Sequence, residues 1–98
     1  MSKSEQRTEA IRNAHFTAFL NQAGLCAGCG ESVNRYGTAQ LGHKIPQGKR
    51  WIRKYGAEVI HSPLNMALTC CLRCNGKVDI RNRPLEIAAL VAKIKETL

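Results

Sequence analysis

The sequence predicts an α+β fold: one small domain over residues 1–98, with two short strands in the middle of the chain and a helix at each end. A chain of 98 residues is long enough for one domain and too short for two. Hydrophobic residues make up 44% of it, which is too many for a wholly disordered protein. Because so short a chain buries only a modest core, we also expect a disulfide or metal staple.

Helical spacing of apolar residues predicts the two terminal helices. The N-terminal unit covers residues 1–24, with its helix over 4–23 and Gly24 able to end it in the left-handed conformation. The C-terminal helix covers residues 84–98, and Pro84 suits its first turn. The apolar positions at helical spacing are Phe16, Phe19, Leu20 and Ala23 in the first helix, and Ile87, Leu90, Val91, Ile94 and Leu98 in the last.

The middle of the chain predicts two strands and a short helix. Residues 38–45 alternate loosely between apolar and polar side chains, which is typical of a strand, and residues 65–70 form a second extended segment. A long connection, residues 49–64, joins them and contains a helical turn at 49–55. A further helix begins near the last cysteines and ends at about Ile80.

The five cysteines lie at positions 26, 29, 70, 71 and 74. The first residues lack the apolar segment of a secretory signal, so we expect a reducing, cytoplasmic location in which disulfides are rare. The odd number of cysteines also argues against disulfides. Two Cys-x-x-Cys pairs instead predict a tetrahedral zinc site, with buried free thiols as the alternative. Its ligands are Cys26, Cys29, Cys74 and either Cys70 or Cys71, but not both.

The charge of the chain predicts a polyanionic partner. Fifteen Lys and Arg against seven Asp and Glu give a formal charge of +8, and residues 32–57 contain no acidic side chain. Phosphates attract such blocks, so we expect nucleic-acid binding; the alternative is a solvated basic face. Trp51 and Tyr55 lie inside the basic stretch, where they either stack on bases or belong to the core. The candidate contacts are Lys44, Lys49, Arg50, Arg53, Lys54 and Lys77.

Four short motifs lie within residues 26–80. They are Cys-Ala-Gly-Cys at 26–29, Leu-Gly-His-Lys-Ile-Pro at 41–46, Asn-Met-Ala-Leu-Thr-Cys at 65–70 and Cys-Asn-Gly-Lys at 74–77. In this order they resemble the HNH nuclease family, also called the ββα-metal finger. The resemblance implies a zinc-stapled ββα core of the treble-clef kind over residues 26–80. It also implies a nuclease whose stand-alone members often come from phages, prophages or bacterial defence systems.

The resemblance implies a role for each polar residue of the motifs. His43 corresponds to the general base, and an imidazole near neutral pKa suits that task. Asn65 corresponds to the residue that orients this histidine. Asn75 corresponds to a ligand of one catalytic Mg²⁺ or Mn²⁺ ion, which would be separate from the structural zinc. Without the family, His43 is an ordinary half-buried histidine, Asn65 a turn residue and Asn75 a helix cap.

One position departs from the family pattern. The residue before the catalytic histidine is usually Asp, His or Glu and binds the metal, whereas this chain has Gly42. Three interpretations follow: fewer protein ligands assisted by water and phosphate, a substitute ligand at His61 or Asp79, or an inactive site. The family also often has a cysteine five residues after the middle Asn, which favours Cys70, whereas Cys-x-x-Cys spacing favours Cys71.

Two functions of different classes follow from these observations. The first is a metal-dependent DNA endonuclease that nicks DNA or makes a double-strand break, with DNA as its partner in a bacterial or phage-infected cell. The second is a non-catalytic, zinc-dependent nucleic-acid-binding module, which the glycine at position 42 favours. A protein-interaction finger ranks last, and a protein partner or a homodimer stays open. No apolar run is long enough to predict a membrane span.

Overall fold

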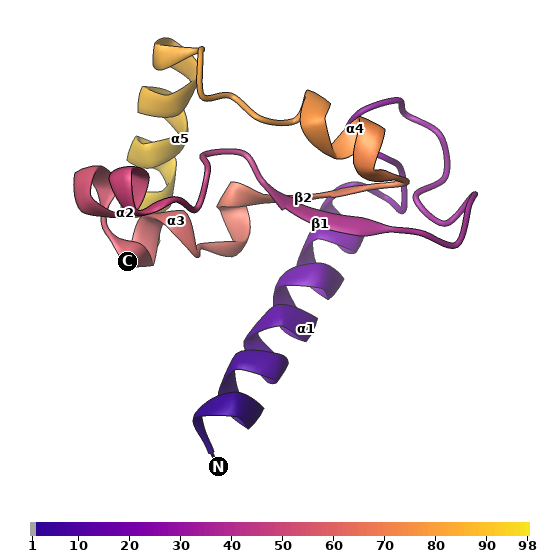
Figure 1. The fold of residues 1–98 in the computed structure, drawn as a ribbon, viewed down its shortest axis with the longest axis horizontal. Coiled ribbons are helices and arrows are strands. Elements are labelled where there is room, and N and C mark those ends of the chain that lie inside the picture. Colours follow the sequence, from indigo (N-terminus) through magenta and orange to yellow (C-terminus); the bar gives the residue numbers. More distant parts are fainter. Residues whose placement is uncertain (1) are drawn as a thin grey trace.

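A computed structural model describes residues 2–98 and confirms the α+β class (Figure 1). Two short strands form one antiparallel sheet, and helices lie before, between and after them. The elements in chain order are α1 (Lys3–Asn21), β1 (Gln40–His43), α2 (Lys49–Tyr55), α3 (Ala57–Ile60), a 3-10 turn (Pro63–Asn65), β2 (Met66–Thr69), α4 (Leu72–Lys77) and α5 (Pro84–Lys95).

The two-stranded sheet has α1 on one side and α4 on the other (Figure 1). Its register pairs Leu41 with Leu68 and His43 with Met66. Leu41 and Leu68 pack with Ala18 of α1, which fixes the face of β1 that this helix covers. Because side chains alternate along a strand, His43 shares the α1 face with Leu41, and Gly42 belongs to the α4 face.

The first helix contacts the sheet through alanines, and the expected aromatic face is largely exposed. Ser2 caps α1 by accepting a hydrogen bond from the Glu5 N–H, and the helix ends before Gly24, whose φ is +74°. The buried residues of α1 are Ala14 and Ala18, whereas Phe16, Leu20 and Ile11 are exposed to 63%, 60% and 53%. Phe16 and Leu20, two of the apolar positions at helical spacing, thus lie outside the core, because small side chains bring this helix close to the sheet.

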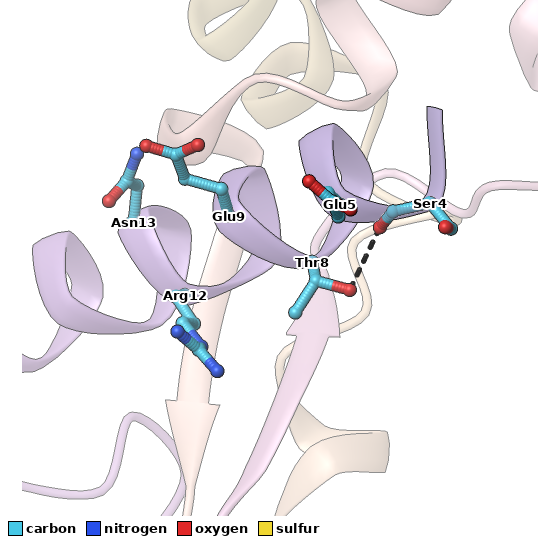
Figure 2. A pocket seen from close by; sticks show the side chains of 6 residues that line it. All are labelled: Ser4, Glu5, Thr8, Glu9, Arg12 and Asn13. Carbon is cyan, nitrogen blue, oxygen red and sulfur yellow. Dashed lines mark hydrogen bonds between the residues drawn. The ribbon is translucent and has the colours of Figure 1, made fainter. Parts of the chain in front are cut away.

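The N-terminal half of α1 projects away from the rest of the molecule (Figure 1). A shallow hollow on it is lined by residues of this one helix, including Glu5, Glu9 and Arg12 (Figure 2). Thr8 Oγ1 donates to the Ser4 carbonyl across 2.9 Å in the same hollow. No other element contributes a side chain to it, so this hollow is a helix surface and not an assembled site.

The larger hydrophobic core lies between the α2–α3 segment and α5, beyond the end of the sheet. Pro84 is at the start of α5 as expected, and three of its predicted apolar residues are buried. Full burial of each aliphatic side chain contributes about 1.5–3 kcal/mol. The core residues are Ile45, Val59, Ile60, Ile80, Ile87, Val91 and Ile94, and Trp51 and Tyr55 pack at its edge.

The strands are shorter than the sequence patterns predicted, because Asn65 takes over the pairing at their ends. The Lys44 N–H donates to the Asn65 carbonyl over 2.7 Å, and the Ile45 N–H donates to Asn65 Oδ1 over 2.8 Å. These bonds replace the regular ladder that segment 38–45 would have continued. Asn65 itself ends the 3-10 turn, so β2 begins only at Met66.

The helix after the cysteines ends at Lys77 and not near Ile80. Gly76 weakens the helix, and the Ile80 N–H donates to the Lys44 carbonyl over 2.9 Å, which draws this segment alongside β1. The helical turn at 49–55 is confirmed as α2, whereas α3 was not predicted. None of the helices between residues 2 and 98 is both long and apolar enough to cross a membrane.

Candidate functional site

A tight turn presents the first two cysteines. Leu25 and Ser32 form an isolated antiparallel bridge, and the Cys26 N–H donates to the Glu31 carbonyl over 2.7 Å. The Gly30 N–H closes the turn on the Cys26 carbonyl over 2.9 Å, with φ of Gly30 at +79°. A glycine adopts this left-handed conformation without the steric cost of a Cβ atom. The turn therefore holds two sulfurs on one side of a rigid loop.

This turn packs directly against the start of α4, where the last cysteine lies. A Cβ atom at Gly28 would come within 2.7 Å of the Cys74 Cβ, so only glycine allows the approach. The N–H groups of Gly28 and Cys70 each donate to the Cys26 sulfur over 3.3 Å. Such N–H to sulfur bonds stabilise a thiolate and hold it in place for a metal.

Four sulfurs meet between the turn and α4. Those of Cys26, Cys29, Cys70 and Cys74 all lie within 4.8 Å of one another, and Cys70 Sγ is 3.8 Å from both Cys29 Sγ and Cys74 Sγ. A tetrahedral zinc with Zn–S bonds of about 2.3 Å requires S–S distances of about 3.8 Å. The donor set therefore fits zinc, and Cys71, whose Sγ is 3.9 Å from Cys70 Sγ, lies outside the group of four.

The charges around the cluster favour a bound cation. Burial alone would raise the pKa of Cys26, but the N–H groups of Cys29, Cys70 and Gly28 lower it to about 6. Burial and the neighbouring thiols raise the pKa of Cys74 to about 12. Four thiolates this close repel one another without a metal, and a divalent cation removes that repulsion while releasing protons.

His43 and His61 meet in a cleft beneath α1. Their ring centroids are 5.6 Å apart in an edge-to-face arrangement. The cleft, about 650 Å³ in volume, is bounded by Arg7 and Asn13 of α1 and by His43, Gln47, His61 and Met66; we call it the histidine cleft. Neither Asp nor Glu lines it within the described chain.

The His43 imidazole is only partly accessible. Its Nε2 atom is buried and has no hydrogen-bond partner among the described residues, which is rare for a buried polar atom. Burial, and then the charge of the nearby His61, lower the pKa of His43 below its usual 6.5. His43 is therefore a neutral imidazole near pH 7, which can accept a proton.

Asn65 is a backbone clamp and does not orient His43 through its side chain. The carboxamide is fully buried, and its nitrogen donates to the carbonyls of Ile45 over 3.0 Å and Ile60 over 2.8 Å. Its oxygen accepts from the Ile45 N–H. Both N–H groups of the carboxamide are used in this way, so the expected bond to the imidazole is not formed.

Asn75 lies on the other face of β1, against Gly42. A Cβ atom at position 42 would overlap Asn75 Oδ1, which explains why a glycine is present. The Asn75 carboxamide thus fills the space beside position 42. His43, Asn65 and Asn75 do not point to one place as the sequence motifs led us to expect: His43 lines the histidine cleft, Asn65 clamps the backbone and Asn75 of α4 faces Gly42.

The candidate DNA contacts fall into separate groups. Lys44 and Lys77 line one hollow, of about 390 Å³, together with Arg83. Arg50 and Lys54 line another hollow, between α2 and α5, whereas Lys49 and Arg53 are exposed and line neither. Asp79, a candidate metal ligand, forms a 2.8 Å ion pair with Arg81, which lowers its pKa. This pairing leaves Asp79 a poor substitute for the ligand missing at position 42.

Three residues of the site had no signal in the sequence. The Gln22 side chain accepts from the Leu68 N–H over 2.8 Å and donates to the Leu68 carbonyl over 2.9 Å, so it pairs like a third strand at the edge of β2. Arg7 borders the histidine cleft, although its helix is remote from the motifs. Arg35 lies beside the sulfur cluster, where the Cys70 thiol raises its pKa.

Comparisons with protein-family models, with curated proteins and with solved structures gave no match for this chain. The possible chemistry of this chain therefore follows from its own residues. These comprise a four-cysteine cluster that can bind zinc, a cleft with two histidines, and two hollows rich in basic side chains.

Proposed function

We propose that the protein is a DNA endonuclease of the HNH kind, in which zinc holds a ββα core together and His43 acts as general base. The observation that supports this most is the His43 imidazole: its Nε2 atom lacks a partner and its pKa is lowered, so it is neutral at pH 7. A titratable side chain in a cleft, with a pKa shifted by burial and by a neighbouring group, is typical of functional sites.

The proposed reaction is hydrolysis of a phosphodiester bond. The half-buried His43 imidazole takes a proton from a water molecule, and the resulting hydroxide forms a new bond to phosphorus. The bond between phosphorus and the 3′ oxygen breaks, and that oxygen leaves with the electron pair and is protonated from solvent. Arg7, at the edge of the same cleft, supplies positive charge for the phosphate oxygens.

The expected Mg²⁺ or Mn²⁺ site does not fit the residues of the histidine cleft. Mg²⁺ prefers carboxylate and other oxygen ligands, and the cleft offers two imidazoles and the amides of Asn13 and Gln47. Asn75, the ligand implied by the family, faces Gly42 on the opposite side of β1. We therefore assign no step to a catalytic ion.

A second candidate is a zinc-dependent nucleic-acid-binding module without catalysis. The contact between Gly42 and Asn75 favours it, because this contact fills the position of the missing metal ligand. The Asn65 carboxamide favours it too, since the backbone uses both of its N–H groups. This module would have the same cysteine cluster and basic surface, but it would not hydrolyse phosphodiester bonds.

Plasmid nicking separates the two candidates. The parent protein is incubated with supercoiled plasmid in Mg²⁺, Mn²⁺ or EDTA, alongside His43→Ala and the control His15→Ala, which changes an exposed histidine of α1. The endonuclease predicts relaxed or linear plasmid with the parent and control, and none with His43→Ala at equal zinc content. Equal cutting by His43→Ala would refute the mechanism; binding without cutting by any variant would establish the module.

A further inference from the structure

A groove between α2 and α5 combines aromatic and basic side chains and shares no residue with the histidine cleft. Its volume is about 530 Å³. Trp51 and Tyr55 of α2 form one wall of this groove. The opposite wall, on α5, includes the small, exposed side chains of Ala88 and Ala92. We call this hollow the α2–α5 groove.

The two aromatic rings of this groove are parallel and half-buried. Their centroids are 6.3 Å apart and their planes differ by 12°. Each ring has a cation beside it: Arg50 Cζ is 5.3 Å from the Trp51 centroid, and Lys54 Nζ is 5.4 Å from the Tyr55 centroid. The rings thus reach the core on one side and border charged, accessible surface on the other.

The charge of the groove has one sign. Its lining includes Arg50, Lys54, Arg81 and Lys95, and no Asp or Glu of the described chain contributes to it. Arg81 is paired with Asp79, but the other three cations form no ion pair with any residue from 2 to 98. Three unpaired cations around two stacked rings match a ligand that carries both phosphates and flat bases.

We propose that the α2–α5 groove binds single-stranded DNA, with a base stacked on Trp51 and phosphates held by Arg50, Lys54 and Lys95. Aromatic residues in a basic groove are the usual means of binding unpaired strands, because every unpaired base offers a flat face. A duplex keeps those faces stacked inside. The inference rests on the proposed function only in that both require nucleic acid; it needs no cleavage.

Trp51 is the only tryptophan of the chain, so its fluorescence reports on this groove alone. The zinc-loaded protein is titrated, without added Mg²⁺ or Mn²⁺, with oligothymidylate of about 15 nucleotides, with a hairpin duplex of the same length, and with oligouridylate. We expect strong quenching by the single DNA strand and weak quenching by the duplex. Equal quenching by duplex, or binding without any change in Trp51 emission, would overturn the proposal. Stronger quenching by oligouridylate would identify RNA as the ligand instead.

Two lysines of α5 give a matched pair for the test. Lys95 lines the groove, whereas Lys93, two residues earlier on the same helix, does not. For single strands, each lost phosphate contact lowers the salt slope by about 0.7, which is about fivefold in affinity at 0.1 M salt. Lys95→Gln should show this loss and Lys93→Gln should not; equal effects would refute the assignment.

The outcomes also separate this inference from the proposed function. Quenching by a single strand in a protein that cuts no plasmid would retain the groove and refute the endonuclease. Plasmid cutting with unchanged Trp51 emission would support the endonuclease and refute single-strand binding in the groove. Because Lys95 is exposed, its replacement leaves the fold intact, and circular dichroism of both lysine variants checks this.

Discussion

Replacing Cys70 with serine should abolish tight zinc binding, whereas the same change at Cys71 should leave it nearly intact. The Cys70 sulfur lies 3.8 Å from the sulfurs of both Cys29 and Cys74. This distance matches the S–S edge of a ZnS₄ tetrahedron, which is about 3.8 Å. The Cys71 sulfur lies 3.9 Å from that of Cys70 but outside the group of four, and its side chain is partly exposed.

The size of the effect follows from the zinc site as a whole. A structural zinc in a small finger is worth about 10–16 kcal/mol, so each of four thiolates accounts for about 3–4 kcal/mol, or a factor of about 100–1000 in affinity. Cys70→Ser should lose that factor. A partly exposed side chain outside the cluster changes stability by about 0.5 kcal/mol or less, which is the expectation for Cys71→Ser.

The assay is competition with a coloured chelator, followed by zinc analysis of the purified chain. Thermal unfolding with and without chelator gives an independent readout, since zinc loss should lower the melting temperature of the parent and of Cys71→Ser alike. Zinc retained by Cys70→Ser but lost by Cys71→Ser would refute the geometry. It would mean that the Cys-x-x-Cys spacing, and not the distance between sulfurs, selects the ligand.

Three further predictions, each checked by urea unfolding, test the rest of the site. Gly42→Ala should cost about 1–3 kcal/mol, because its Cβ overlaps Asn75, and Asn75→Ala should recover most of that loss; additive losses would contradict the contact. Asn65→Ala should cost about 3 kcal/mol, since it removes three buried hydrogen bonds; a loss below about 1 kcal/mol would contradict the clamp. The lowered pKa of His43 keeps its imidazole neutral in the folded protein. The contribution of the neutral imidazole to the free energy of unfolding is therefore complete above the unfolded-state pKa of 6.5, and it is lost as pH falls through the folded-state pKa. His43→Gln should flatten that acid decline, and an unchanged pH profile would contradict it.

The elements that the sequence predicted well are those set by local chemistry. Pro84 opens the last helix because its fixed φ suits the first turn, and the apolar spacing behind it gives the buried face of α5. The first helix ends at Asn21, a little before the predicted end, and Ala23 as well as Gly24 adopts positive φ after it. The Cys-x-x-Cys turn at 26–29 follows from similar local constraints, so its place in the cluster could be predicted too.

The features that could not be predicted depend on contacts between distant segments. Whether Cys70 or Cys71 joins the cluster depends on the backbone conformation between β2 and α4. That conformation decides which of the two adjacent side chains faces the other sulfurs. The exposure of Phe16 depends on Ala14 and Ala18 making the close contact with the sheet. The clamp role of Asn65 depends on three backbone groups brought together only when the chain is folded.

The order of the motif residues along the chain does not say which of them share a face. Gly42 and His43 are neighbours in β1, so their side-chain directions are opposite, and Asn75 lies on the Gly42 side. An ion or phosphate that contacts His43 in the cleft therefore finds His61 and Arg7 nearby, and not Asn75. If the protein cuts DNA, loss of His61 should thus matter more than loss of Asn75. A larger loss of cutting on replacement of Asn75 than of His61 would require side chains from both faces of β1 to contact one phosphate at the end of the strand.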